Sequence, residues 1–137
     1  MAVATAVTFV WLGMVLAISF LETPLKFRAP GVTIPIGLGI GRLVFRALNA
    51  AETVLAIGLV VTLVVAEPGA IAVIAGTIVV VVLGLQLAVV RPRLTKRSDR
   101  VLAGEQAPRS HAHHAFIGLE CAKVLALLVT GVALLTA

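Results

Sequence analysis

The chain has 137 residues, of which 61% are hydrophobic and 12% are charged, with a formal net charge of +5 and a mean hydropathy of +1.16. A soluble domain is about half apolar and about a quarter charged, so this composition excludes a soluble fold and predicts an integral membrane protein whose partner is the lipid bilayer. The basic residues lie at the ends of apolar segments without interleaved aromatic residues, which excludes nucleic acid as an expected partner.

Four apolar segments are each long enough to cross a bilayer as a helix, which takes about 20 residues. They run over about 2–21, 43–66, 70–90 and 112–136. The first segment lacks the basic start and the small-residue cleavage site of a signal peptide, so we expect it to be retained as a span. The sequence therefore predicts one all-α domain, an integral membrane four-helix bundle.

The connection between the first two spans contains Pro24, Pro30 and Pro35, and these prolines predict a loop over 22–41 because proline interrupts a helix. Within it, Gly37 and Gly41 have the spacing that permits close helix packing in a membrane. A phosphate-binding loop is disfavoured there, because no strand precedes the glycines.

The third span is apolar on all sides except at Gln86, so we expect it to face lipid or a partner subunit. The hydrophilic run 91–110 that follows predicts a solvated basic loop. A bundle this small and this rich in Gly and Ala is also a candidate for a homo-oligomer.

The basic residues are distributed unevenly between the two ends of the predicted bundle. All of the 11 Lys and Arg except Lys123 flank the first or the third connection, and the turn Glu67-Pro68-Gly69 has none. By the positive-inside rule, connections 22–42 and 91–111 are predicted to be cytoplasmic. Both termini are then outside, and the protein is placed in the cell inner (plasma) membrane as a multi-pass protein.

Two spans carry polar residues at depths where charge is costly. Arg42, Arg46, Asn49 and Glu52 follow one another at spacings of four, three and three, which puts them on one helix face. The fourth span carries Glu120 and Lys123.

The helical rise puts Glu52 and Lys123 at similar depths, about 15 Å from the basic end. Charges so deep face the bundle interior and pair with one another. Glu52 with Lys123 is one predicted pair, and Glu120 with Arg46 or Asn49 is another. Lys123 can alternatively reach Glu120 on its own helix.

These residues predict a polar seam between spans two and four, with two interpretations. The pairs either fix the register of the two helices or line a path entered from the cytoplasm. Glu22, which ends the first span, is a candidate residue at the mouth of such a path, and an ion pair with Lys26 is its simpler role.

The three histidines begin the fourth span. His111 and His114 can share a helix face, and imidazole is the commonest ligand of transition metals. Cys121 lies about 10 Å further along the helix than His114, so one ion cannot bind both. A metal site would need His111, His114 and a further ligand such as Glu22, Asp99 or a second subunit. The alternative is that the histidines only begin the helix at the membrane interface, and otherwise no cofactor is indicated.

Short motifs over most of the chain resemble a family of small four-span membrane proteins without an assigned biochemistry. They are Trp11-Leu-Gly13, Arg91-Pro92-Arg93, and His114 with Glu120. The family includes bacterial members and a human transmembrane protein linked to resistance to platinum drugs. The resemblance implies the four-span layout and no activity.

Two functions are consistent with these features. One is a small transporter, channel or efflux component for a small ion or solute, with the polar seam as its path. The other is a non-catalytic scaffold or accessory subunit whose buried charges only hold helices together. An enzyme is not expected, because the chain lacks a nucleophile–base arrangement, a metal motif and a phosphate loop.

Overall fold

The computed structural model describes residues 1–106 and 111–137, and all the regular elements of that part are helices. Their bounds are α1 (Ala2–Val15), η1 (Leu16–Glu22), α2 (Thr23–Lys26), α3 (Ile34–Ala66), α4 (Ala70–Leu85), η2 (Gln86–Val90), α5 (Arg91–Leu102) and α6 (His111–Leu135). The elements η1 and η2 are π-helical and continue the helices on either side of them. Four continuous helices result, Ala2–Lys26, Ile34–Ala66, Ala70–Leu102 and His111–Leu135, and each is long and apolar enough to cross a membrane.

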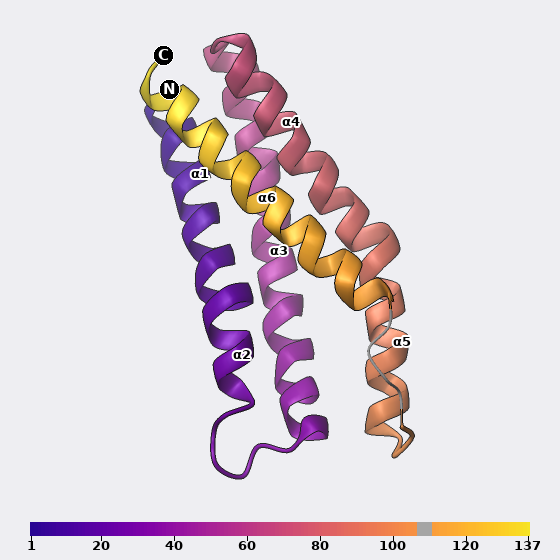
Figure 1. Cartoon of the computed structure of the whole chain (residues 1–137). Coiled ribbons are helices and arrows are strands. Elements are labelled where there is room, and N and C mark those ends of the chain that lie inside the picture. Colours follow the sequence, from indigo (N-terminus) through magenta and orange to yellow (C-terminus); the bar gives the residue numbers. More distant parts are fainter. Residues whose placement is uncertain (107–110) are drawn as a thin grey trace.

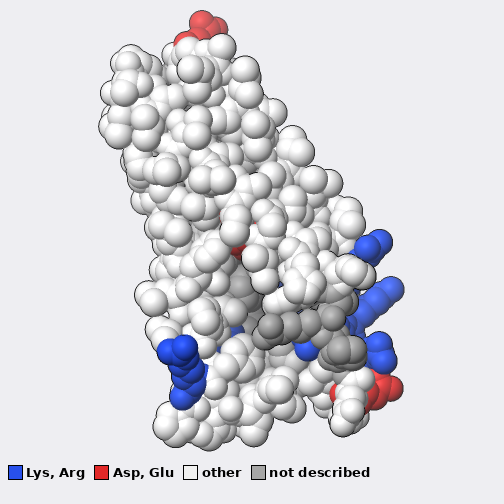
Figure 2. Space-filling view, viewed as in Figure 1, with Lys and Arg blue, Asp and Glu red and all other residues white. Residues whose placement is uncertain are grey.

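The four long helices form one bundle with both chain termini at the same end (Figure 1). The helix α6 crosses the bundle obliquely and packs most extensively against α4 and then α1, while α1 also packs against α3. Lys and Arg gather at the end opposite the termini, and the surface between the ends is almost free of charge (Figure 2). We call the end with these bases the basic end.

The exposed surface of this bundle is apolar, and a few charged side chains are fully buried inside it. Val65 and Val64 on α3 are 79% and 69% exposed, whereas Lys123 and Glu52 are 0% and 1% exposed. Charged side chains are rarely fully buried in soluble proteins unless they are paired, and large apolar surfaces are rare on them. An apolar exterior around a mostly apolar core that contains a small cluster of paired charges fits a hydrocarbon surrounding. The prediction of an all-α bundle with four candidate membrane spans is therefore confirmed at this level.

The expectation that 22–41 and 91–110 are loops is wrong in part. The first helix continues to Lys26, and α3 already begins at Ile34. Thr33 caps α3, because its Oγ1 accepts a hydrogen bond from the Ile36 N–H at 3.3 Å, and Pro35 lies in the first turn, where its missing N–H costs nothing. Most of the predicted basic loop is likewise helix α5, while Arg109 lies outside the described residues.

Each π-helical segment ends just before a proline inside a continuous helix. Thr23, before Pro24, donates its N–H to the carbonyl of Ile18, and Arg91, before Pro92, donates to the carbonyl of Gln86. Proline normally breaks a helix, because its ring clashes with the carbonyl four residues earlier and it has no N–H. A widened turn with bonds over five residues relieves that clash. The helices therefore pass through both prolines.

Glycines set the close contacts between the helices. A Cβ on Gly37 would come within 2.2 Å of the Phe27 ring, and one on Gly41 would come within 3.1 Å of Lys26 Nζ. Gly37 and Gly41 therefore contact side chains at the end of the first helix, and close helix packing through them stays a prediction. Gly76 plays the same part for α4, since its Cβ would come within 2.7 Å of Leu63. The third span thus has one face inside the bundle, and only its other face points outward as expected.

Candidate functional site

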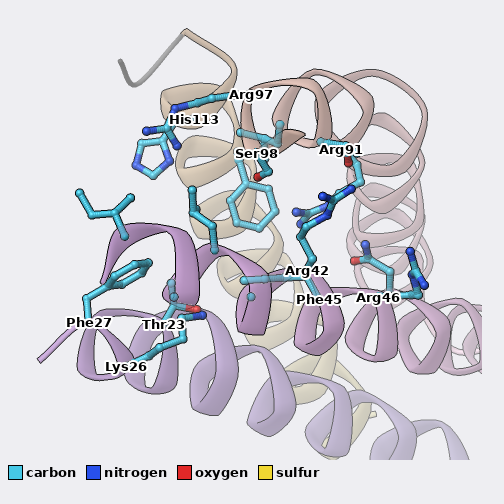
Figure 3. A pocket seen from close by; sticks show the side chains of 18 residues that line it. Thr23, Lys26, Phe27, Arg42, Phe45, Arg46, Arg91, Arg97, Ser98 and His113 are labelled. Atoms are coloured by element: carbon cyan, nitrogen blue, oxygen red, sulfur yellow. The ribbon is translucent and has the colours of Figure 1, made fainter. Parts of the chain in front are cut away.

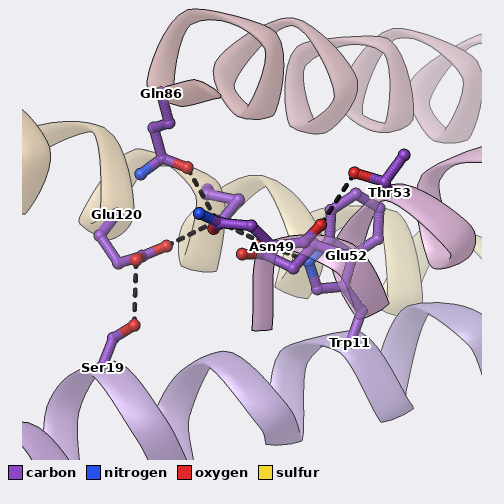
Figure 4. A network of polar contacts seen from close by, with 8 residues as sticks. Trp11, Ser19, Asn49, Glu52, Thr53, Gln86 and Glu120 are labelled. Carbon is purple, nitrogen blue, oxygen red and sulfur yellow. Dashed lines mark hydrogen bonds and ion pairs between the residues drawn. The ribbon is translucent and has the colours of Figure 1, made fainter. Parts of the chain in front are cut away.

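A buried network of polar side chains lies midway along the bundle (Figure 4). Its centre is the ammonium group of Lys123, which lies 2.5 Å from Glu52 Oε2, 2.7 Å from Glu120 Oε1 and 2.8 Å from Gln86 Oε1. Trp11 donates its indole N–H to Glu52 Oε2 at 2.8 Å, and Ser19 donates its hydroxyl to Glu120 Oε2 at 3.0 Å. We call these six residues the Lys123 network.

All four long helices contribute to the Lys123 network. Trp11 and Ser19 come from the first, Glu52 from α3, Gln86 from η2, and Glu120 and Lys123 from α6. An ammonium group has three N–H donors, and here it donates hydrogen bonds to Glu52 Oε2 and Gln86 Oε1, while Glu120 Oε1 forms an ion pair with it but accepts no hydrogen bond from the described residues. The side chains of Lys123 and Glu52 are 1% and 2% exposed.

The two π-helical segments help to position this network. Ser19 lies in η1 and Gln86 lies in η2, each a few residues before the proline that the widened turn accommodates. A π-helical turn changes the direction of the side chains relative to the rest of its helix, and such turns are frequent at functional sites. The prolines near the basic end are thus connected to the geometry of the buried network.

A cavity of about 620 Å³ opens at the basic end (Figure 3). Residues of α2, α3, α5 and α6 line it. Its basic lining residues are Lys26, Arg42, Arg46, Arg91, Arg97 and His113. No Asp or Glu is found among the described residues that line it. We call it the basic cavity.

The basic cavity and the Lys123 network are one helical turn apart on three helices. Asn49 and Phe116 line the cavity, and each lies one turn from a carboxylate of the network, Glu52 and Glu120 respectively. Arg91 also lines the cavity and lies one π-helical turn beyond Gln86. Residues of the basic cavity and residues of the Lys123 network therefore follow one another along three helices.

Arg91 is a basic residue of the cavity that packs against residues of two other helices, α3 and α6. Its guanidinium carbon lies 4.8 Å from the ring centroid of Phe45 and 5.0 Å from that of Phe116, and the two rings meet edge to face. It also interacts electrostatically with Glu52 and Glu120. The formal charges of Arg91, Lys123 and these two carboxylates sum to zero.

The structure divides the predicted polar seam into two groups. Glu52, Glu120 and Lys123 belong to the Lys123 network, whereas Arg42, Arg46 and Asn49 line the basic cavity. The expected contacts of Lys123 with Glu52 and Glu120 are both formed. Glu120 contacts Ser19 on the first helix, however, in place of the predicted Arg46 or Asn49.

Glu22 takes the simpler of its two predicted roles. Its Oε2 lies 3.7 Å from Lys26 Nζ, and Glu22 is not among the residues that line the cavity. Arg42, which does line it, forms an ion pair with Asp99 on α5 at 2.7 Å. This pair joins α3 to the segment that was expected to be a loop.

Three network residues were not predicted as site residues, and each had a signal in the sequence. Gln86 is the strongly polar residue of the third span, and Trp11 lies in the middle of the first span, away from the usual interfacial belt. Ser19 is one of the few polar residues of that span. A rule that every polar side chain at mid-membrane depth finds a partner would have found all three.

The proposed metal ligands His111 and His114 are exposed, and His114 packs edge to face against His113. Within residues 1–106 and 111–137, no three His, Cys, Asp or Glu side chains lie close enough to hold a metal ion. A site completed by a second subunit stays a prediction.

The site therefore consists of a compensated charge cluster and a cationic cavity, and its chemistry is ion pairing and hydrogen bonding. No known protein supplies a role for it: no family model matches the chain, and no curated protein or solved structure shows significant similarity to it.

Proposed function

We propose that the protein is a small multi-pass membrane carrier that admits a small anionic solute through the basic cavity and holds it back at the Lys123 network. The observation that carries the proposal is the position of a cationic cavity one helical turn from buried ion pairs. A cavity lined by charges of one sign raises the local concentration of the opposite ion.

The Lys123 network has the composition of a gate that works by exchange of partners. Lys123 contacts two carboxylates, so it can keep one of them when an arriving anion replaces the other. Gln86 adds a donor for that anion, because its Nε2 is buried without a hydrogen-bond partner among the described residues. A buried unsatisfied N–H costs about 1–3 kcal/mol, so an arriving oxygen atom is favoured there.

The proposal includes an orientation in the membrane. The positive-inside rule places the basic end in the cytoplasm and both termini outside, in the plasma membrane. The basic cavity is then a cytoplasmic entrance. A homo-oligomer and membership of the small four-span family that the sequence resembles stay predictions.

The alternative function is a scaffold or accessory subunit, and one observation favours it. The Lys123 ammonium forms ion pairs with Glu52 and Glu120 and donates a hydrogen bond to Gln86, and the network is buried from solvent. Such a network can fix the register of four helices without passing anything. Transport must therefore be measured directly.

The test uses purified protein reconstituted into phosphatidylcholine vesicles. Uptake of radiolabelled chloride, acetate and glycerol 3-phosphate is compared for the wild type, Glu52→Gln and Thr130→Val. Thr130 is a matched control, because it is fully buried but donates only to its own helix, to the carbonyl of Ala126 at 2.7 Å.

We expect uptake of at least one anion by the wild type and by the control. Uptake by Glu52→Gln should be lower than that of the wild type by a factor of about ten or more, as expected for loss of one interaction with a charged group. Glu52→Gln should still purify as a folded protein. Uptake no greater than in protein-free vesicles would refute the carrier function. Loss of folding in Glu52→Gln together with absent uptake would favour the scaffold.

A further inference from the structure

We infer that the basic cavity is a binding site for a phosphate group carried on an apolar body. The inference rests on the proposed function in that the same cavity is the entrance for the solute. It goes further by naming the class of ligand. Binding can be measured in a protein that transports nothing, so the two proposals can fail separately.

Lys26 is the first residue that points to a ligand. Its side chain is only 5% exposed and lines the cavity, and the one carboxylate near it is that of Glu22 at 3.7 Å, beyond hydrogen-bond distance. Glu22 Oε2 is itself buried without a hydrogen bond to the described residues. A buried ammonium group has three donors that need acceptors. Lys26 therefore provides unused donors at the wall of the cavity.

Arg91 and Arg46 provide further donors from two other helices. Arg91 is held by cation–π contacts with Phe45 and Phe116, which use the faces of the rings and leave its N–H groups available. Neither Arg46 nor Arg91 has an ion pair within 4.0 Å in the described part of the chain. Both side chains point toward the cavity in Figure 3.

The number of bases around the cavity favours phosphate over carboxylate. One guanidinium satisfies a carboxylate through two parallel hydrogen bonds. Here Lys26, Arg46 and Arg91 line the cavity from α2, α3 and α5, and together they offer more donors than a single carboxylate can use. A phosphate group has more oxygens and up to two negative charges, and arginine geometry suits it. The hydroxyl groups of Thr95 and Ser98 in the same wall add donors for it.

The remaining wall of the cavity is apolar and continues onto the outer surface. Phe27 and Ile34 line the cavity and are also 38% and 61% exposed. Leu38 and Leu94 line it between them. The volume of about 620 Å³ is that of a site for a ligand of drug size, about 300–1,000 Å³, and exceeds what an inorganic ion needs. The ligand therefore has an apolar part beside its phosphate.

Such a group can come from two sources, a phospholipid of the surrounding bilayer or a soluble phosphate ester. Native mass spectrometry of the detergent-purified full chain distinguishes them. The probes are dioleoyl phosphatidic acid, water-soluble hexyl phosphate, and oleate as a carboxylate of similar apolar character. Each is titrated against the wild type, Lys26→Gln, Arg46→Gln, Arg91→Gln and the control Lys96→Gln.

Lys96→Gln is a matched control, because Lys96 is an exposed base on α5 that does not line the cavity. We expect one phosphate probe to bind the wild type and the control equally, and at least ten-fold more weakly to each of the three cavity variants, in line with loss of one charge-assisted hydrogen bond. Arg46 is exposed and has no ion pair with the described residues, so Arg46→Gln retains the fold even if Lys26→Gln does not.

Equal binding of phosphatidic acid and hexyl phosphate would show that a soluble phosphate ester is a sufficient ligand. Binding of phosphatidic acid alone would identify a phospholipid as the ligand. Both outcomes support the site. Binding that Lys96→Gln weakens as much as the cavity variants would overturn it, as would tighter binding of oleate or no binding of either phosphate probe. Binding without uptake into vesicles would refute the carrier and leave this site standing.

Discussion

Lys123→Met is the substitution whose effect can be worked out most fully from the contacts. It removes the ammonium group from between Glu52 and Glu120 and leaves both carboxylates in a site where the side chains are 2% exposed. Removal of one partner from a buried ion pair costs about 3–5 kcal/mol, because the other charge stays buried and unpaired. Two carboxylates are affected here, so we expect the upper end of that range.

Glu52→Gln should be much milder, although it changes the same network. The amide oxygen of the new side chain can still accept from Trp11 and Lys123, and Lys123 keeps its ion pair with Glu120. A hydrogen bond to a charged group contributes about 1.5–3 kcal/mol and a neutral one about 0.5–1.5 kcal/mol, so the expected loss is about 1 kcal/mol. The contacts of the network therefore predict that Lys123→Met loses more stability than Glu52→Gln.

The assay is unfolding of the purified protein in mixed micelles by titration with sodium dodecyl sulfate, followed by far-ultraviolet circular dichroism. Thr130→Val serves as the buried polar control and should lose about 0.5–1.5 kcal/mol, as for one neutral hydrogen bond. Adding Glu120→Gln to Lys123→Met should restore part of the loss, because it removes one unpaired charge. A Lys123→Met protein that unfolds within about 1 kcal/mol of Glu52→Gln would refute the network as the main polar support of the bundle.

Two further predictions concern packing and orientation. Gly118→Ala should raise the free energy of unfolding by about 0.4–1 kcal/mol, because the new Cβ meets no atom within 4 Å and alanine favours the helix. Gly131→Ala should gain less than Gly118→Ala, because its Cβ would come within 2.6 Å of the Phe9 ring, which has to shift. Equal melting temperatures for these two variants would contradict the packing of α6 on α1. For orientation, alkaline phosphatase fused after Ala137 should be active, since that end is predicted to be outside, and phosphatase inserted at Gly104 should be inactive. The reverse pattern would invert the topology and the side of the cavity.

The sequence by itself determined the helical class, the number of candidate spans and the end at which the bases gather. These properties are local, because hydropathy over about 20 residues decides whether a helix can cross a bilayer. The depth argument also paired Glu52 with Lys123 correctly, since the rise of a helix is constant and both residues lie equally far from the same end.

Only the tertiary structure decided how the helices are rotated and which polar groups meet. Lateral contacts such as Glu120 with Ser19 depend on the rotation of two helices about their axes, which a pattern of hydropathy does not specify. The π-helical segments that carry Ser19 and Gln86 also overrode the local rule that proline ends a helix, because a widened turn relieves the clash that a regular helix would suffer. One predicted seam thus became a closed network and an open cavity, separated by a single helical turn.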